Sequence, residues 1–215
     1  TFDFGGAAKA CLRLHLGLLK MGIDSKVLVL SKSDENLPKI YEYKPYKQII
    51  PKKTIWDKLK RKTKRILREF YLIKEELIEK DYTKTQFLGD RLPGLEMYSY
   101  PQSEIDITNN ELFNDADIIH LHWVARFLDY DSFFRKCKKP VIWILHDMFP
   151  FTGGEHYTET ILCINNNGYP VKRLKSEYEI EMDMKNLEIK RKALSHIDNL
   201  RIVSPSNWLK KEAES

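Results

Sequence analysis

The residues of this sequence best suited to chemistry are histidines that end apolar runs. His120 and His122 end one such run, and His146 ends another and is followed by Asp147. A histidine at the end of a strand can hydrogen-bond a hydroxyl group, exchange a proton or ligate a metal ion. Because side chains alternate along a strand, His120 and His122 point to the same face. These residues indicate a polar binding site or a metal site.

Two glycine pairs accompany the histidines. Gly5 and Gly6 precede a predicted helix, where free backbone N–H groups and the helix dipole suit a phosphate or another anion. A tight strand-to-helix turn is the alternative. An aromatic loop follows His146 and contains Phe151, Thr152, Gly153 and Gly154. Loops of this kind bind sugars and other flat polar molecules, or pack on their own domain.

Other reactive patterns are weak or absent from the sequence. The pair His120 and His122 with His146 suggests a metal site, but no third and fourth ligand follows at a recognisable spacing. A hydrogen-bonded core histidine beside one that lines a cleft is the alternative. No P-loop, no HExxH and no Ser-His-Asp signature occurs. Glu155 and His156, after the second glycine pair, are expected to be loop residues.

Composition narrows the class of protein. The chain has 215 residues, of which 42% are hydrophobic and 31% are charged, which fits one globular domain and excludes wholesale disorder. A net charge of +5 is too small to name a nucleic-acid partner. The three cysteines are far apart, which argues against a disulfide framework. With no apolar run near the roughly 20 residues that span a bilayer and no signal peptide, a cytoplasmic protein is expected.

The elements that must position these residues alternate between strands and helices. Strands are expected at 26–31, 117–123, 140–147 and 200–203, and helices at 6–22, 130–138, 176–196 and from 206 onward. Loops are expected at 32–51, 81–110 and 148–174. This alternation predicts an α/β fold with a Rossmann-like parallel sheet and helices on both faces. The strand that should precede Gly5 is missing, so the natural protein is expected to start earlier.

A second unusual feature is a basic amphipathic helix predicted over 52–80. One of its faces is apolar, and lysines and arginines crowd the rest between Lys52 and Arg68. That basic side is either a solvated face of a helix packed on the domain or a surface that docks on anionic lipid head groups.

Four blocks of the sequence resemble bacterial family 4 glycosyltransferases of the GT-B fold. The segment 1–30 contains GGAAKACLRLHLGLLKMGIDSKVLVL, and residues 116–130 read ADIIHLHWVARFLDY. Residues 139–157 read KPVIWILHDMFPFTGGEHY, and residues 199–209 read NLRIVSPSNWL. The four blocks occur in the same order as in the family, and the HDMFPFTGG stretch is the most specific.

The resemblance implies a retaining transfer of a sugar from a nucleotide-diphosphate sugar to a polysaccharide or lipid-linked acceptor, with no metal and no other cofactor. Residues 1–215 are then a single Rossmann-like N-terminal domain on the acceptor side, with 52–80 as an insert. The second domain, which holds most of the donor, is missing. The fragment alone is therefore expected to be inactive or nearly so. The basic helix is a candidate for holding the enzyme on the inner face of the cell membrane.

The resemblance also assigns roles to residues. His146 matches the histidine that contacts the transferred sugar, and Gly5 and Gly6 match the loop that approaches the donor phosphates. The acceptor side takes His122, Trp123, Phe151, Thr152, Gly153 and Gly154. Relatives often have a cysteine where this chain has Glu155, so a cysteine-linked loop is not expected here.

Two rival classes remain at this point. One is a non-catalytic module that binds a saccharide or a nucleotide. The other is a metal hydrolase built on His120, His122 and His146, which elemental analysis for zinc would test.

Overall fold

The structure is a computed structural model, and its contacts divide the chain into two units. The first unit is Thr1–Pro45 with Glu96–Ser215, and the second is Tyr46–Leu95. The helix expected at 52–80 lies outside the described residues, so it stays a prediction, as does the single domain at 1–215. The residues that the structure describes are 5–32, 36–44, 87–89, 91, 95–157, 161–164, 170–172, 174–195 and 197–214.

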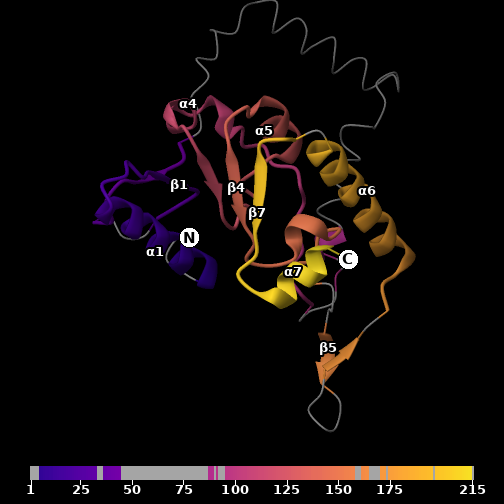
Figure 1. The fold of residues 1–215 in the computed structure, drawn as a ribbon. Helices are drawn as coiled ribbons and strands as arrows, with labels where there is room; N and C mark the ends of the chain where they lie inside the picture. The colour runs from indigo at the N-terminus through magenta and orange to yellow at the C-terminus, as the bar shows by residue number, and fades with distance from the viewer. Residues whose placement is uncertain are drawn as a thin grey trace, which may run out of the picture. The chain divides into compact units, whose positions relative to one another are not determined.

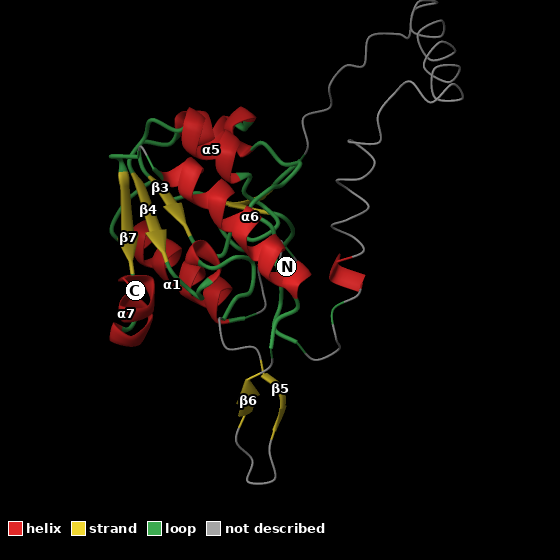
Figure 2. Cartoon of the chain, turned by 90° about the vertical axis from the view of Figure 1, so that its right-hand side faces the viewer, coloured by secondary structure: helices red, strands yellow, loops and turns green. Residues whose placement is uncertain are grey.

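The centre of the first unit is a parallel sheet of three strands. They are β3 (Ile119–Leu121), β4 (Val141–Ile144) and β7 (Leu200–Val203), in the order β3-β4-β7 (Figure 1). Parallel neighbours need crossover connections. Accordingly, α5 (Tyr130–Lys136) joins β3 to β4, and α6 (Glu177–Leu194) lies in the connection from β4 to β7. All three strands therefore end at the same edge of the sheet, toward α7 (Asn207–Glu214) in Figure 2.

A second parallel pair comes from the start of the chain. Helix α1 (Gly6–Lys20) leads to β1 (Val27–Val29), which pairs with β2 (Ile40–Glu42). The buried His15 connects α1 to the loops that precede β1 and β2. Its Nδ1 lies 2.8 Å from Ser25 Oγ, and its Nε2 lies 2.8 Å from the carbonyl oxygen of Pro38. Strand β2 corrects the sequence prediction, which made 32–51 a loop.

The remaining elements are short, and most of them lie in segments that the sequence predicts as loops. The hairpin of β5 and β6 is antiparallel (Figure 2). The hairpin corrects the predicted loop at 148–174, whereas α7 agrees with the helix predicted from 206 onward. These elements are the turns η1 (Ile107–Asn109) and η2 (Phe149–Phe151), the helices α4 (Glu111–Asp115) and α7 (Asn207–Glu214), and the strands β5 (Ile161–Ile164) and β6 (Pro170–Lys172).

Aromatic side chains form the core between the sheet and α5. Trp143 on β4 is 1% exposed, and its ring lies 5.5 Å from Tyr130 and 5.7 Å from Phe134, both on α5. Phe133 follows at helical spacing and is buried against the same cluster. Each buried aromatic side chain contributes about 1.5–3 kcal/mol. The confirmed class is therefore mixed α/β, with parallel sheets and a helix that buries one face.

Gly153 and Gly154 are glycines because other groups fill the space where a side chain would lie. A Cβ added to Gly154 would lie 2.2 Å from the ring of Tyr98. A Cβ added to Gly153 would lie 2.3 Å from Cβ of Asp183 and 2.5 Å from its Cα, on α6. The loop therefore packs directly against α6 and Tyr98. Packing on its own domain was the alternative to ligand binding that the sequence left open for this loop.

The close contact of Gly154 predicts the cost of a methyl group there. Gly154→Ala should lower the free energy of unfolding by roughly 1–3 kcal/mol, because the Tyr98 ring must move. The control is Gly17→Ala, in the middle of α1 with nothing within 4 Å of the added atom. It should raise the same quantity by about 0.5–1 kcal/mol. Urea unfolding measures both, and equal effects would contradict the contact.

Candidate functional site

Two histidines from neighbouring strands meet at the carboxyl edge of the three-stranded sheet. His122 directly follows β3, and His146 follows β4. Nδ1 of His122 lies 3.0 Å from Nε2 of His146, and the two rings stack with their centroids 5.2 Å apart. The parallel register of β3 and β4 produces this meeting, because it brings both strand ends to the same level.

Both imidazoles are held in the neutral form. Burial, together with the neighbouring His146 and His120, lowers the pKa of His122 to about 4. Burial also lowers the pKa of His146, against the opposing effect of the Asp147 carboxylate. Two like charges at 3.0 Å would repel, so the neutral pair is the stable form at pH 7.

The neutral pair leaves one nitrogen of each ring outside the shared hydrogen bond. One ring must donate the shared hydrogen and the other must accept it. In either arrangement of protons, one of the outer atoms, Nε2 of His122 and Nδ1 of His146, is a donor and the other is an acceptor. A hydroxyl group needs such a donor and acceptor, so the pair is suited to orient an alcohol.

Asp147 connects this edge to the rest of the fold. Its carboxylate accepts hydrogen bonds from Trp123 Nε1 at 2.9 Å, from the Phe149 backbone N–H at 3.0 Å and from His156 Nδ1 at 2.5 Å. Asp147 is 8% exposed, whereas the Trp123 side chain is 40% exposed. The carboxylate therefore caps the turn after β4 and also fixes an indole ring at the surface beside the histidine pair.

His156 completes a hydrogen-bonded chain that the sequence did not reveal. Its Nε2 lies 3.0 Å from Ser99 Oγ, so Ser99, His156 and Asp147 have the order of a catalytic triad. Both Ser99 and His156 are only 2% exposed, so a substrate cannot reach the serine. The chain is structural, and His156 is a loop residue, as the sequence predicts, whose burial and hydrogen bonds the sequence did not reveal. The three residues share no local motif because they are far apart in the sequence.

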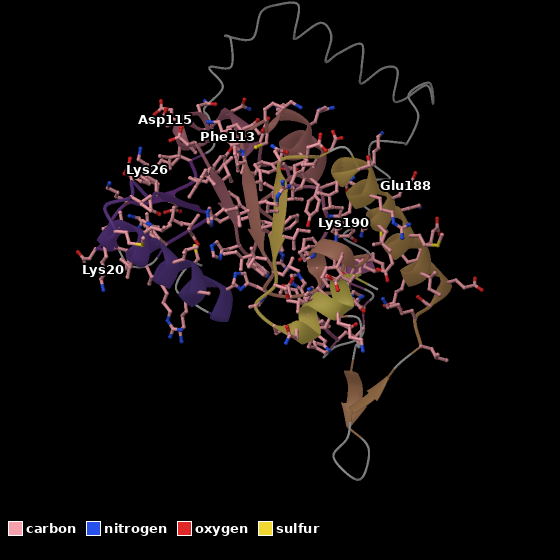
Figure 3. All side chains as sticks on the ribbon, viewed as in Figure 1. Lys20, Lys26, Phe113, Asp115, Glu188 and Lys190 are labelled. Atoms are coloured by element: carbon pink, nitrogen blue, oxygen red, sulfur yellow. The ribbon has the colours of Figure 1, made fainter. Side chains whose placement is uncertain are left out.

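A buried lysine pins the loop after Asp147. Lys190 on α6 is 2% exposed, and its ammonium donates to the carbonyl oxygens of Phe149 and Thr152 and lies 3.8 Å from the centroid of the Phe149 ring. Burial lowers its pKa to about 7, against the carboxylates of Asp147 and Asp183. Figure 3 shows Lys190 on the side of α6 that faces the sheet, opposite Glu188.

The loop borders two separate hollows. The first, of about 10 Å³, has room for about one water molecule. It is lined by His122, Trp123, Val124, Trp143, His146, Asp147, Phe149 and Pro150. The second is about 370 Å³ and is bordered by Phe151, Thr152 and Gly153 together with α6 and α7. The predicted acceptor residues are thus divided. His122 and Trp123, which follow β3, line the first hollow, three loop residues line the second, and Gly154 packs on Tyr98.

Gly5 and Gly6 begin α1. Gly5 has φ 93°, which a side chain would strain, whereas nothing lies within 4 Å of a Cβ added to either residue. The turn therefore requires glycine at Gly5 only. Within the described residues no hydrogen bond joins this end of α1 to the histidine pair. The predicted role of these glycines at a donor phosphate stays a prediction.

The described residues also bear on metal binding, on the cysteine thiols and on membrane-spanning helices. In the part of the chain that the structure describes, no three histidine, cysteine, aspartate or glutamate side chains are close enough together to hold a metal ion. Cys11 and Cys137 have free thiols. No helix of that part combines the length and the apolar character needed to cross a membrane.

Comparisons with models of known protein families, with curated proteins and with solved structures found no match to this chain.

Removing the charge of Asp147 should destabilise the site and the fold together. Asp147→Asn replaces a carboxylate that accepts hydrogen bonds from three N–H groups with a neutral amide. We therefore expect the free energy of unfolding to fall by roughly 3 kcal/mol. Asp131→Asn is the control, because its ion pair with Arg135 is exposed and should contribute at most about 1 kcal/mol. Denaturant unfolding followed by tryptophan fluorescence compares them, and a loss under 1 kcal/mol for Asp147→Asn would refute its central role.

His122 should titrate far below an ordinary histidine. Its folded pKa of about 4 lies below the value of about 6.5 in the unfolded chain. The unfolded state therefore binds an extra proton between these values, and stability is lost as the pH falls from 6.5 toward 4. NMR titration of the ring Cε1 proton measures the midpoint, which His146→Gln should raise by removing the neighbouring charge. A wild-type midpoint near 6.5 would contradict the buried, paired geometry.

Proposed function

We propose that this chain is the acceptor-side domain of a retaining glycosyltransferase that uses a nucleotide-diphosphate sugar. The observation that supports this most directly is the neutral pair His122 and His146, 3.0 Å apart at the carboxyl edge of adjacent parallel strands. Ligands of open α/β sheets bind beyond that edge. The proposal also rests on the sequence resemblance described above.

We further propose that the two parallel sheets are parts of one Rossmann-like sheet. Their orders are β1-β2 and β3-β4-β7, and Leu28 and Tyr43 of the first pair pack against the core of the second. One strand inserted between β1 and β3, entering α1 through Gly5, gives the doubly wound order β2-β1-new-β3-β4-β7. That strand is the one the sequence predicts before Gly5, and a structure of a longer chain would test its place.

In the proposed reaction each described group has a definite task. His146 orients a sugar hydroxyl through its outer nitrogen, while His122 fixes the position and proton of His146. Trp123, held by Asp147, supplies an apolar wall beside them. Gly5 and Gly6 at the start of α1 approach the donor phosphates. No metal has a step in this scheme, and the acceptor is a saccharide or a lipid-linked saccharide.

A non-catalytic saccharide- or nucleotide-binding module is the second candidate. The observation that favours it is the size of the hollow beside the histidines, about 10 Å³, which does not enclose a sugar ring. Catalysis then requires a further surface to close over the histidine pair, whereas a binding module needs only the larger hollow. Docking of residues 52–80 on an anionic membrane stays a prediction for both candidate functions.

Release of nucleoside diphosphate separates the two candidates. The assay uses the protein encoded by the full reading frame that contains this chain. This protein is incubated with a panel of nucleotide sugars, with and without membrane extract. We expect release with one donor, stimulated by extract, and a fall of about 10²–10⁴-fold in kcat for His146→Ala.

The matched control is His120→Ala, because His120 is exposed on β3 and donates to no described partner in the site. Its kcat should stay within about twofold of wild type. No release with any donor would favour the binding module. Release that survives His146→Ala would remove the histidine pair from the reaction.

A further inference from the structure

Three exposed aromatic side chains lie in the segments that follow the strands β3, β4 and β7. Trp123 is 40% exposed, Tyr157 is 41% exposed and Trp208 is 54% exposed. Single exposed aromatic residues are ordinary on protein surfaces, whereas a connected group of them marks an interaction site. The contacts that join these three side chains therefore decide what they can do.

Tyr157 and Trp208 form a stacked pair, which we name the aromatic platform. Tyr157 lies in the loop after β4, and Trp208 lies in the first turn of α7. The ring centroids are 6.5 Å apart, and the ring planes are 28° from parallel. Near-parallel rings at this separation are offset from each other. The aromatic platform therefore presents a wider apolar surface than either ring alone.

Helix α7 holds Trp208 near the strand end that carries His146. The next residue, Leu209, is 3% exposed and belongs to the same buried cluster as Leu145, which directly precedes His146. The backbone N–H of Leu209 donates to Ser206 Oγ at 3.1 Å, which caps the start of the helix. The exposed ring of Trp208 is therefore carried on a helical turn that is anchored in the core beside the histidine pair.

His156 connects the aromatic platform to Trp123. Its ring lies 5.5 Å from the Trp123 ring, and its Nδ1 and the indole N–H share the carboxylate of Asp147. Tyr157 is the next residue along the chain. Burial and the carboxylates of Asp147 and Glu96 raise the pKa of Tyr157, so its phenol stays protonated and able to donate. The three exposed rings therefore form one connected surface that begins beside the histidine pair.

Hydrogen-bonding groups beside these rings narrow the class of ligand. His122 and His146 together supply one outward donor and one outward acceptor, which suits an alcohol. A ligand for the whole surface therefore needs an apolar face for the rings and alcohol groups for the histidines. A sugar unit has both features. An acyl chain and a nucleobase can contact the rings, but neither carries an alcohol.

We propose that this surface binds an oligosaccharide of at least two sugar units, with one unit on Trp123 beside the histidine pair and the next on the aromatic platform. The hollow beside the histidines, about 10 Å³, does not enclose a sugar ring, so the affinity comes from stacking on an open surface. Tyrosine and tryptophan suit this role because they offer a large contact area with few rotatable bonds to fix. The inference rests on the proposed function only in making the oligosaccharide the acceptor.

Calorimetry of neutral saccharides binding to the whole chain, without any donor, tests this inference. The probes are glucose, galactose, mannose and N-acetylglucosamine, and for each the disaccharides of two identical units. We expect at least one disaccharide to bind about two- to tenfold more tightly than its monosaccharide, because the second unit adds one stacking contact. Equal affinities within every such set, or no binding of any probe at millimolar concentration, would overturn the proposal. Tighter binding to phosphatidylglycerol vesicles than to any saccharide would assign the rings to a membrane and would also overturn it.

A variant of the aromatic platform locates the second sugar unit. Trp208→Ala removes an exposed ring, so it should lower the disaccharide affinity to that of the monosaccharide and leave the monosaccharide affinity unchanged. Trp208→Phe keeps a ring and should restore most of the difference. The matched control is Tyr41→Ala, because Tyr41 is 44% exposed on β2 of the other sheet, and it should change neither affinity.

A disaccharide preference that survives Trp208→Ala, or that Tyr41→Ala removes equally, would contradict a sugar unit on the aromatic platform. Because no transfer is measured, failed nucleotide release would refute the proposed function and leave this result standing.

Discussion

The rest of the site depends on one buried carboxylate. A charged Asp147 at 8% exposure is tolerable only if donors surround it, and its donors come from three places: the end of β3, the turn after β4 and the segment at His156. Satisfying the carboxylate therefore brings three stretches of chain to one point. The exposed face of Trp123 and the path of the loop are consequences of that requirement.

Helix α6 supplies the second constraint through a polar stripe on its inner side. Asp183, Asn186 and Lys190 recur at helical spacing, and each contacts the loop or Tyr98. The ammonium of Lys190 satisfies two loop carbonyl groups that would otherwise be buried without a partner. With both ends of the loop held, Phe149 and Pro150 line the hollow beside the histidines, and the run Phe151, Thr152 and Gly153 lines the larger hollow.

The sequence predicted the elements whose signal is local. The apolar runs that became β4 and β7 and the amphipathic start of α1 were recognised, as was the meeting of His122 and His146 at one edge. Strand β2 was missed because only three residues of it pair, within a polar segment. His156 and Lys190 were missed because burial of a polar side chain depends on partners distant in sequence, and a single sequence gives no sign of which ones meet.

The strand order has a consequence for handling the protein. Among the described residues β7 pairs only with β4, and its side chains Ile202 and Val203 are 57% and 45% exposed. An apolar outer strand with free backbone groups is a template for pairing with another chain. Self-association in concentrated solution should therefore begin at this edge, and a lysine in place of Ile202 is the substitution that would discourage it.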